Sequence, residues 1–376
     1  MPDFSIMENP AVFVKDGKIV EIVKRRTDQS FRTSSLDEYI DHGSGILTPG
    51  FINCHTHMEL SFLKEKLDCS KGFKAWIQEL IIRRENAEHH HIKSCAKKEF
   101  EDIHRKGTIA IGDISSTGIV KDLFLDSEMD GFIFYEEIGG AENFLHEDID
   151  PKISFAAHAP HTTSPKLIKN IKAFTKRMNK PFSIHSGESS EEKRFISGEN
   201  KGWEEFLLSR GIDSSLWPFP SRSSVSYLDS LGVLDDKTLL VHMLDYFYED
   251  IEIIKQRGSS ICFCPTSNMK LHGRYPDIKK LINSGINCCI GTDSLASSDS
   301  IDIFDEMKLL FSDFGLSPKT ILQMATIHGA KALLIDLRYG VLKRGMDAKF
   351  VYIDIDDHVN ILESIIFSSE KLREVV

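Results

Sequence analysis

Hydrophobic segments rich in β-branched and aromatic residues recur along the chain, and segments with helical periodicity separate them. The segments that we predict to be strands are residues 46–57, 108–114, 131–138, 153–160, 181–186, 238–243, 259–265 and 287–293. Amphipathic stretches such as FKAWIQELIIRREN and SPKLIKNIKAFTKRM lie between them. Nearly continuous hydrophobic runs are typical of strands buried on both faces, and their alternation with helices favours a parallel sheet. The pattern therefore predicts an α/β fold, a closed (β/α)8 TIM-type barrel.

The two ends of the chain have a different pattern. Residues 11–23 predict two short strands around Asp16-Gly17, a typical hairpin turn, and residues 340–355 are again rich in turns and β-forming residues. We therefore predict a small β-sandwich-like domain. The predicted division is 1–47 plus 335–376 for this domain and 48–334 for a catalytic barrel domain. The longest irregular region, about residues 187–237, is a candidate lid or substrate loop.

Composition and charge narrow the function classes. The 376 residues carry a formal net charge of -11, which disfavours general affinity for nucleic acid or anionic membranes. Neither a signal peptide nor a hydrophobic run of membrane-spanning length is recognised, so we expect a cytoplasmic protein. Seven cysteines, an odd number, indicate reduced thiols rather than a disulfide framework. The expected partner is a small-molecule substrate, and a homo-oligomer is left open.

Histidine and aspartate occur at the ends of several predicted strands. In a barrel, active-site groups come from the C-terminal ends of the strands. The residues found there are His55, His57, His158, His185, His242 and Asp293. Three imidazoles and one carboxylate suit one divalent metal ion, Zn2+ or Fe2+, with room for a water molecule. Glu188 lies three residues after His185 and is a candidate proton shuttle, whereas Glu191 and Glu192 fit a helix N-terminus.

Several motifs resemble the amidohydrolase superfamily. These are PGFINCHTH, HSGE, LLVHM, CPTSNMKL and GTDSLASSDSIDIFDEM, and the resemblance spans nearly the whole chain in the right order. Binuclear members carry a lysine at the end of strand 4, but the segment FAAHAPHTTS has none. The resemblance is therefore to the mononuclear branch, which includes cytosine, guanine and adenosine-type deaminases and triazine chlorohydrolases.

The resemblance implies roles for the strand-end residues. The metal ligands would be His55, His57, His185 and Asp293. Glu188 and His242 would handle protons, and Asp293 would also accept a proton from the attacking water. The implied reaction is hydrolytic displacement of ammonia from an aminated ring carbon.

Further residues resemble the branch acting on adenosine derivatives, the S-adenosylhomocysteine, methylthioadenosine and aminodeoxyfutalosine deaminases. The substrate-binding positions that this resemblance implies are Glu59, Trp76, Glu85, His158 and Ser297. The segments HTHMELS and ENKGWEEF look most similar to aminodeoxyfutalosine deaminases of a menaquinone pathway. Trp76 also fits a core position and Glu85 a solvated helix position.

Other interpretations remain open. The benzoate of aminodeoxyfutalosine requires a cation, and the irregular region offers Lys193, Arg194, Lys201 and Arg222, all of which also fit ordinary surface charge. Alternative activities are deamination of another aminated ring and triazine-type chlorohydrolysis. A barrel that only binds ligands is a further alternative, but the presence of Glu188, His242 and Asp293 favours an enzyme.

Overall fold

The computed structural model describes residues 5–25, 38–140, 144, 150–199, 201–355, 360–368 and 373–375. Its central sheet has eight parallel strands in the order β11-β10-β9-β8-β7-β6-β5-β4. The strands are β4 (Phe51–Thr56), β5 (Thr108–Ser115), β6 (Asp130–Glu137), β7 (Ile153–Ala157), β8 (Phe182–Ser186), β9 (Thr238–His242), β10 (Ser260–Phe263) and β11 (Cys288–Ile290). All eight predicted strands are present, and the predicted barrel fold is confirmed.

Contacts between the first and last strands of the sheet close the barrel. Thr56 forms a parallel bridge with Asp293, and the backbone N–H groups of Thr292 and Asp293 donate to the carbonyl oxygen of His55. Most strand residues are buried, because helices cover the outside and side chains fill the inside. The closure places the segment after β11 directly beside the end of β4.

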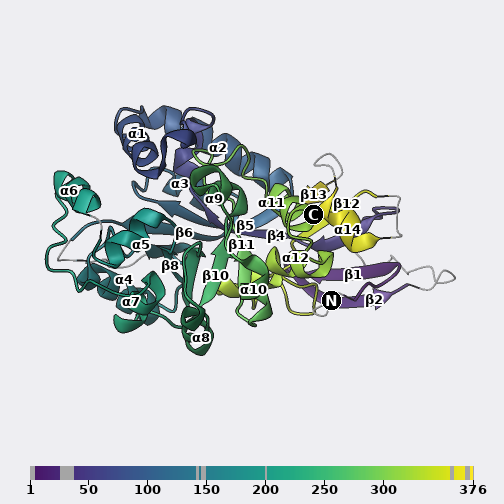
Figure 1. Cartoon of the computed structure of the whole chain (residues 1–376). Helices are drawn as coiled ribbons and strands as arrows, with labels where there is room; N and C mark the ends of the chain where they lie inside the picture. Colours follow the sequence, from purple (N-terminus) through teal and green to yellow (C-terminus); the bar gives the residue numbers. More distant parts are fainter. Residues whose placement is uncertain are drawn as a thin grey trace.

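Helices surround the barrel (Figure 1). They are α1 (Phe73–Glu85), α2 (His89–Arg105), α3 (Lys121–Leu125), α4 (Pro165–Arg177), α5 (Ser190–Ile196), α6 (Lys201–Ser209), α7 (Ser224–Ser230), α8 (Tyr248–Arg257), α9 (Pro265–His272), α10 (Ile278–Asn283), α11 (Ile303–Ser312), α12 (Pro318–Met324), α13 (Ile327–Ala332) and α14 (Ile361–Ile366), with the 3-10 helices η2 (Met58–Leu63) and η3 (Cys69–Lys71). The two amphipathic stretches predicted to be helical correspond to α1 and α4. Pro165 at the first position of α4 and Ser164 as its N-cap explain where that helix begins.

The first predicted strand proved to be two strands. Residues 46–57 divide into β3 (Ile46–Pro49), which belongs to a different sheet, and β4 of the barrel. The break lies at Gly50, where a Cβ atom would come within 2.4 Å of the Ile109 side chain. The single-strand prediction was therefore wrong at this point, because the chain passes from one sheet to the next through a glycine packed against β5.

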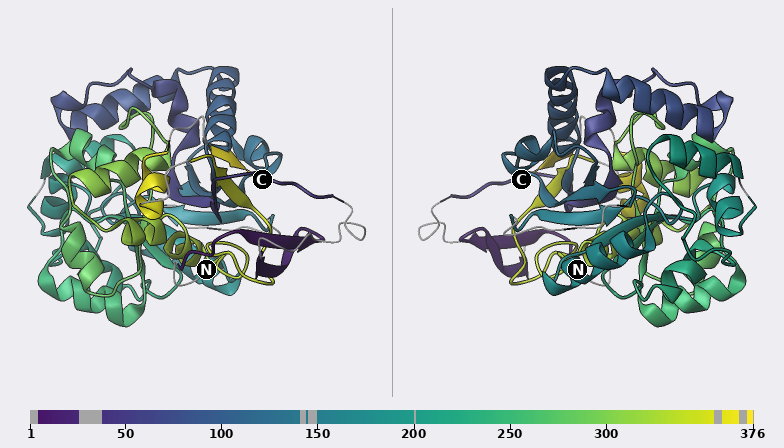
Figure 2. Two further views of the ribbon diagram at one scale, coloured as in Figure 1. Left: turned by 90° about the vertical axis from the view of Figure 1, so that its right-hand side faces the viewer. Right: turned by 90° about the vertical axis from the view of Figure 1, so that its left-hand side faces the viewer.

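The ends of the chain meet beside the barrel. The predicted hairpin is present as β1 (Pro10–Lys15) and β2 (Lys18–Lys24), which pair antiparallel. A second sheet has the order β13-β12-β3, with β12 (Phe350–Ile353) antiparallel to both β3 and β13 (Arg373–Val375). In Figures 1 and 2 these strands lie near both termini, and α5 and α6 lie at the other end of the molecule in Figure 1. The domain boundaries given above stay a prediction.

The region predicted to be irregular contains regular structure. Three short helices, α5, α6 and α7, lie within residues 187–237, and Ser189 and Ser223 cap two of them. The connections between these helices are non-helical, and Trp203 and Phe195 are buried within the segment. The prediction of a purely irregular loop was wrong, since short helices with mixed polar and apolar residues give little periodic signal.

All seven cysteines are free thiols, as predicted. Among the described residues, no helix combines the length and the hydrophobicity needed to span a bilayer.

Candidate active site and metal centre

The predicted metal ligands lie together at the C-terminal ends of the barrel strands. His55 belongs to β4 and His57 follows it, His185 belongs to β8, and Asp293 follows β11. The Nε2 atom of His55 is 3.2 Å from Nε2 of His57 and 3.2 Å from Nε2 of His185. The Oδ1 atom of Asp293 is 3.5 Å from Nε2 of His57 and 3.9 Å from Nε2 of His55. Four donor groups from three strands therefore converge on one point.

A hydrogen bond fixes which nitrogen of His185 faces this point. Its Nδ1 atom lies 2.8 Å from the carbonyl oxygen of His158, and a carbonyl only accepts, so Nδ1 carries the hydrogen. The lone pair of His185 is then on Nε2, which faces His55. A backbone carbonyl that fixes the tautomer in this way is a common partner of metal-binding histidines.

The cluster suits a single divalent cation. Adjacent nitrogen ligands of one tetrahedral Zn2+ are separated by about 3.3 Å, given Zn–N bonds near 2.0–2.1 Å. Burial, followed by the neighbouring imidazoles, lowers the pKa of His55 well below its usual value, and burial also lowers the pKa of His57 and of His185. The rings are thus neutral and able to coordinate a metal, and without a cation their converging lone pairs would repel one another.

Two further combinations of donor atoms lie within 4.8 Å of one another. They are His55 with His185 and His242, and Glu136 with His158 and His185. Both share His185, whose Nδ1 already donates to a carbonyl, so this ring has one lone pair and serves one ion. His242 belongs to the first of these groups, and the family resemblance assigns it to proton handling.

Asp293 presents its two carboxylate oxygens to different groups. Oδ1 faces the histidines, whereas Oδ2 lies within hydrogen-bonding distance of the hydroxyl groups of Ser267 and Ser297. The backbone of Asp293 has a positive φ of 58°, and His242 one of 77°. Left-handed conformations of non-glycine residues are costly and are concentrated at functional sites. Ser297, predicted to bind substrate, is placed so that it orients Asp293.

Glu188 lies beside this cluster on the segment after β8. Glu192 holds the segment, because its carboxylate accepts hydrogen bonds from the N–H groups of Gly187 and Glu188 at 2.9 and 2.8 Å. Burial alone would raise the pKa of Glu188, but the imidazoles of His242 and His272 outweigh it and hold this pKa well below its usual range. Glu188 is therefore ionised and accepts a proton before it can donate one. Glu192 lies in the first turn of α5, as predicted, and it is fully buried.

The predicted substrate residues other than Ser297 have diverse surroundings. Glu59 is buried in η2, and it accepts hydrogen bonds from the hydroxyl groups of Ser115 and Thr117 and from the N–H of Ser116. Trp76 is buried on α1 and donates to the carbonyl of Ala296, which follows Asp293 on the chain. The ring centroid of His158 is 5.1 Å from that of His185. Glu59 thus binds the end of β5 and the loop after it, Trp76 contacts the segment after β11, and His158 lies beside His185.

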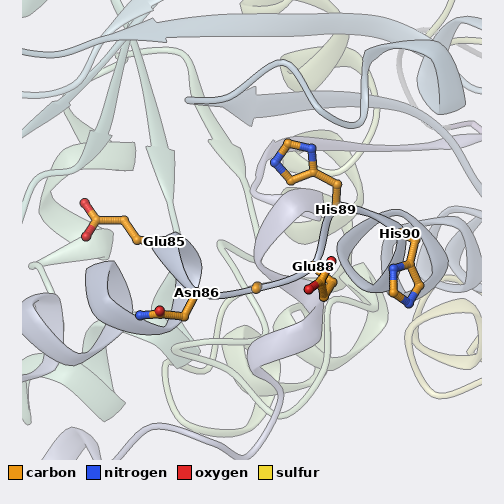
Figure 3. Close-up of a pocket in the computed structure, with 6 residues that line it drawn as sticks. Glu85, Asn86, Glu88, His89 and His90 are labelled. Carbon is orange, nitrogen blue, oxygen red and sulfur yellow. The ribbon is translucent and has the colours of Figure 1, made fainter.

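Glu85 has a different environment. Its side chain is 52% exposed and pairs with Arg210 at 2.6 Å. An open pocket on the surface is lined by Glu85 and by residues 86–90, where α1 ends and α2 begins (Figure 3). The solvated position that the sequence left open is the one observed, although a role in substrate binding stays a prediction.

Three of the four candidate cations have acidic partners. Lys193 pairs with Asp245, Arg194 with Glu191, and Arg222 with Glu249 and Asp250. Lys193 and Arg222 both lie over the ring of Phe247, at 6.0 and 5.7 Å from its centroid. These two share a small pocket with Asp245 and Phe247, next to the segment after β9. The side chain of Lys201 lies outside the described residues.

Three buried polar residues near the cluster were missed by the sequence analysis. Glu136 of β6 has its Oε1 atom 3.7 Å from Nδ1 of His185, and His272 has its Nε2 atom 3.6 Å from Glu188. His161 is 1% exposed, and neither ring nitrogen has a hydrogen-bond partner among the described residues. The histidine after AAHAP was a visible signal for His161. No local pattern distinguishes Glu136 or His272, since their positions depend on how strands and helices assemble.

A parallel barrel with imidazoles and carboxylates gathered at the C-terminal ends of its strands has the arrangement of a hydrolytic metalloenzyme. The chain belongs to the amidohydrolase family, whose model matches residues 46–376. The predicted superfamily and the predicted hydrolase class are thereby confirmed. Amidohydrolases depend on metal ions, in agreement with the histidine-rich cluster.

The individual relatives described below have low sequence identity to this chain. The chain is 27% identical over 402 residues to the 5-methylthioadenosine/S-adenosylhomocysteine deaminase of Thermoanaerobacter pseudethanolicus, covering 97% of this chain and 86% of the relative. The structure of Helicobacter pylori aminofutalosine deaminase with methylthio-coformycin aligns with a TM-score of 0.82 at 24% identity, covering 99% and 93%. A zinc-bound adenosine deaminase from Xanthomonas campestris aligns with a TM-score of 0.78 at 20% identity, covering 99% and 87%. At these identities, the two structures support the fold.

Proposed function

We propose that this amidohydrolase is a metal-dependent deaminase that hydrolyses a 6-aminopurine nucleoside derivative to the 6-oxo product and ammonia. The observation that carries the proposal is the placing of Glu188 and His242 beside a cluster of three imidazoles and Asp293. Their side chains are 3.8 Å apart, and both are buried. The names of the relatives, deaminases of adenosine-type nucleosides, favour this class of substrate.

The proposed ligands of the ion are His55, His57, His185 and Asp293. When bound, a divalent ion acts as a Lewis acid that makes water a stronger acid and nucleophile near neutral pH. Zn2+ and Fe2+ both suit this set of donors, and the zinc in the Xanthomonas campestris protein favours Zn2+.

The remaining groups of this chain move protons. Asp293, with Oδ2 held by two serine hydroxyls and Oδ1 facing the histidines, would accept the proton of the attacking water. Glu188 is ionised, so it takes up a proton and then passes it to a ring nitrogen, which makes the ring carbon more electrophilic. His242 donates from Nδ1 to the Oδ1 atom of Asn268 at 2.8 Å, which leaves its Nε2 as an acceptor directed toward the site. Asp293 then gives the proton taken from the water to the departing amino group, which leaves as ammonia and completes the exchange of an amino group for an oxygen.

The more specific substrate that we propose is aminodeoxyfutalosine. It is supported by the resemblance of HTHMELS and ENKGWEEF to enzymes for that substrate and by the structural similarity to the Helicobacter pylori protein. The pocket that contains Lys193 and Arg222 lies beside the segments after β8 and β9, and a substrate carboxylate bound there would replace Asp245 or Glu249 as their partner. The alternative is methylthioadenosine or S-adenosylhomocysteine, favoured by the name of the Thermoanaerobacter relative.

A panel of substrates tests these proposals. Release of ammonia is measured with enzyme reconstituted with Zn2+ or Fe2+ on aminodeoxyfutalosine, methylthioadenosine, S-adenosylhomocysteine, adenosine, guanine and cytosine, and release of chloride on a chlorinated triazine. Deamination of the adenosine derivatives, lost in Glu188→Gln, supports the proposal. Chloride release would favour a chlorohydrolase, and ligand binding without turnover of any compound would favour a non-enzymatic barrel.

A further inference from the structure

One carboxylate oxygen of Glu188 faces two imidazoles that come from different elements. Its Oε1 atom is 3.8 Å from Nε2 of His242, at the end of β9, and 3.6 Å from Nε2 of His272, the last residue of α9. All three residues are buried or nearly so; the side chain of His272 is 6% exposed and that of His242 is 2% exposed. The family resemblance gives a role to His242, whereas His272 belongs to none of its motifs.

The hydrogen bonds of the two imidazoles differ. His242 donates from Nδ1 to Asn268, so whenever its ring is neutral it has no hydrogen on Nε2 to donate to Glu188. The buried Nε2 atom of His272 has no hydrogen-bond partner among the described residues. Leaving a buried polar atom unpaired is costly, and the carboxylate of Glu188 is an acceptor within reach.

From this geometry, and on the basis of the proposed function, we infer that His272 is a positioning residue for Glu188. Its Nε2–H points to Oε1 of Glu188 in the free enzyme, and this hydrogen bond shortens when substrate is bound. Catalytic hydrogen bonds are often long in a free enzyme and shorten in the complex, so a separation of 3.6 Å fits this role. With Oε1 held, the Oε2 atom is directed to exchange a proton with water and with the substrate ring.

Contacts on either side hold His272 and Glu188 in place. The ring of His272 lies 4.9 Å from that of Phe73 on α1, and Phe73 stacks in turn on Trp203 of α6 at 6.4 Å. The backbone of Glu188 is held by Glu192. Because aromatic side chains already restrict the ring of His272, it loses little side-chain entropy when it forms a hydrogen bond. It can therefore orient the carboxylate of Glu188, whose backbone is also held in place.

Two substitutions at position 272 separate the hydrogen bond from the packing. His272→Phe keeps a ring against Phe73 but removes the donor; kcat should fall about 10- to 100-fold, the range for a hydrogen bond to a charged group, with KM and metal content little changed. His272→Gln retains an N–H donor and should recover most of the loss. The matched control is His104→Phe on α2, where another histidine lies 3.8 Å from a glutamate, Glu128, outside the site; its kcat should stay within about twofold.

A double-mutant cycle tests whether His272 acts through Glu188. In a Glu188→Gln background, His272→Phe should cost little more, because the interaction is already removed. A merely structural residue would lower kcat by the same factor in both backgrounds, and that result would overturn the inference. So would normal kcat in His272→Phe, or equal damage in His272→Phe and His272→Gln.

A measurement that does not depend on turnover completes the test. In 15N NMR of the metal-loaded protein, Nε2 of His272 should be protonated, and its resonance should shift in Glu188→Gln whereas that of His104 should not. An unprotonated Nε2, or no shift, would overturn the inference even if the substrate were misassigned. If Glu188→Gln is inactive but His272→Phe is normal, only the role of His272 fails; if Glu188→Gln retains full activity, the proposed proton transfer itself fails.

Discussion

The carboxylate of Asp130 accepts a hydrogen bond of 2.6 Å from the hydroxyl group of Tyr339, across 209 positions of sequence. Asp130 is the first residue of β6, and Lys349 and Arg338 also donate to it, at 2.8 and 3.3 Å. One nearly buried carboxylate thus joins the barrel to the segment that leads into β12. Burial alone would raise the pKa of Asp130, but Lys349, Tyr339 and Arg338 together hold it below the usual value.

The stability of the protein should therefore depend on Asp130. We expect Asp130→Asn to lower the free energy of unfolding by about 1.5–3 kcal/mol at neutral pH, as for other hydrogen bonds to charged groups. Because the folded-state pKa is depressed, this contribution is present above the ordinary pKa of 3.8 and is lost as the pH falls through the folded-state value. Denaturant unfolding of both proteins as a function of pH measures the difference. Asp122→Asn, with a side chain 74% exposed, is the control, and a difference unchanged at low pH would contradict the assignment.

A single metal ion should be bound per chain. The four donors converge on one point, and His185 has only one free lone pair, so elemental analysis of the reconstituted protein should give about one divalent ion. His57→Ala should lower the metal content and the activity together. His328→Ala, which changes a histidine on α13, serves as the control. Two ions per chain at stoichiometric occupancy would show that the Glu136 group binds metal as well.

Glu188→Gln should retain the fold and the metal but lose at least ~10²-fold in kcat, the usual scale for a general acid or base. Glu191→Gln is the matched control, because Glu191 lies three positions on and pairs with Arg194 instead. Steady-state kinetics of both variants, with metal analysis, check this. Loss in Glu191→Gln but not in Glu188→Gln would reassign the proton transfer.

Gly291 is packed so closely against β4 that a methyl group should displace His55, one of the proposed metal ligands. A Cβ atom at this position would lie 2.7 Å from Cβ of His55 and 2.8 Å from Sγ of Cys262. We expect Gly291→Ala to weaken metal binding and to destabilise the fold by about 1–3 kcal/mol, as overpacking does. Gly140→Ala, where nothing lies within 4 Å, is the control. Metal titration and thermal unfolding measure both effects, and unchanged metal affinity would show that β4 can move aside.

The fifth prediction concerns the values of kcat/KM for different substrates. Contacts with a group remote from the reacting carbon can stabilise the transition state, so kcat/KM should fall steeply from aminodeoxyfutalosine to adenosine, and guanine and cytosine should be poor. Lys193→Gln and Arg222→Gln should lower kcat/KM for aminodeoxyfutalosine more than kcat/KM for adenosine. Equal turnover of guanine or cytosine would defeat the substrate proposal and leave the deaminase mechanism standing.

The sequence was informative where metal-binding residue types stand at the ends of hydrophobic runs. Each barrel strand is a hydrophobic run, and His55, His185 and Asp293 stand at the ends of such runs, so both the fold and the cluster could be predicted. The break at Gly50 was missed because β3 and β4 are both hydrophobic, and nothing local reveals that they belong to different sheets. Glu136 and His272 were missed for a related reason. Their relation to His185 and Glu188 exists only after elements distant in sequence have packed together.

The placing of β3 and β4 in different sheets affects how the chain folds during its synthesis. These two strands are consecutive, but β3 pairs with β12 and β4 closes the barrel against the segment after β11. As the polypeptide leaves the ribosome, β4, which carries His55 and precedes His57, therefore has one unpaired edge until most of the chain has been synthesised. Such long-range pairings are slow to form, and the exposed edge is a site for misassociation during that interval. The four proposed ligands come together only when the last barrel strand docks, so metal uptake would be a late step in maturation.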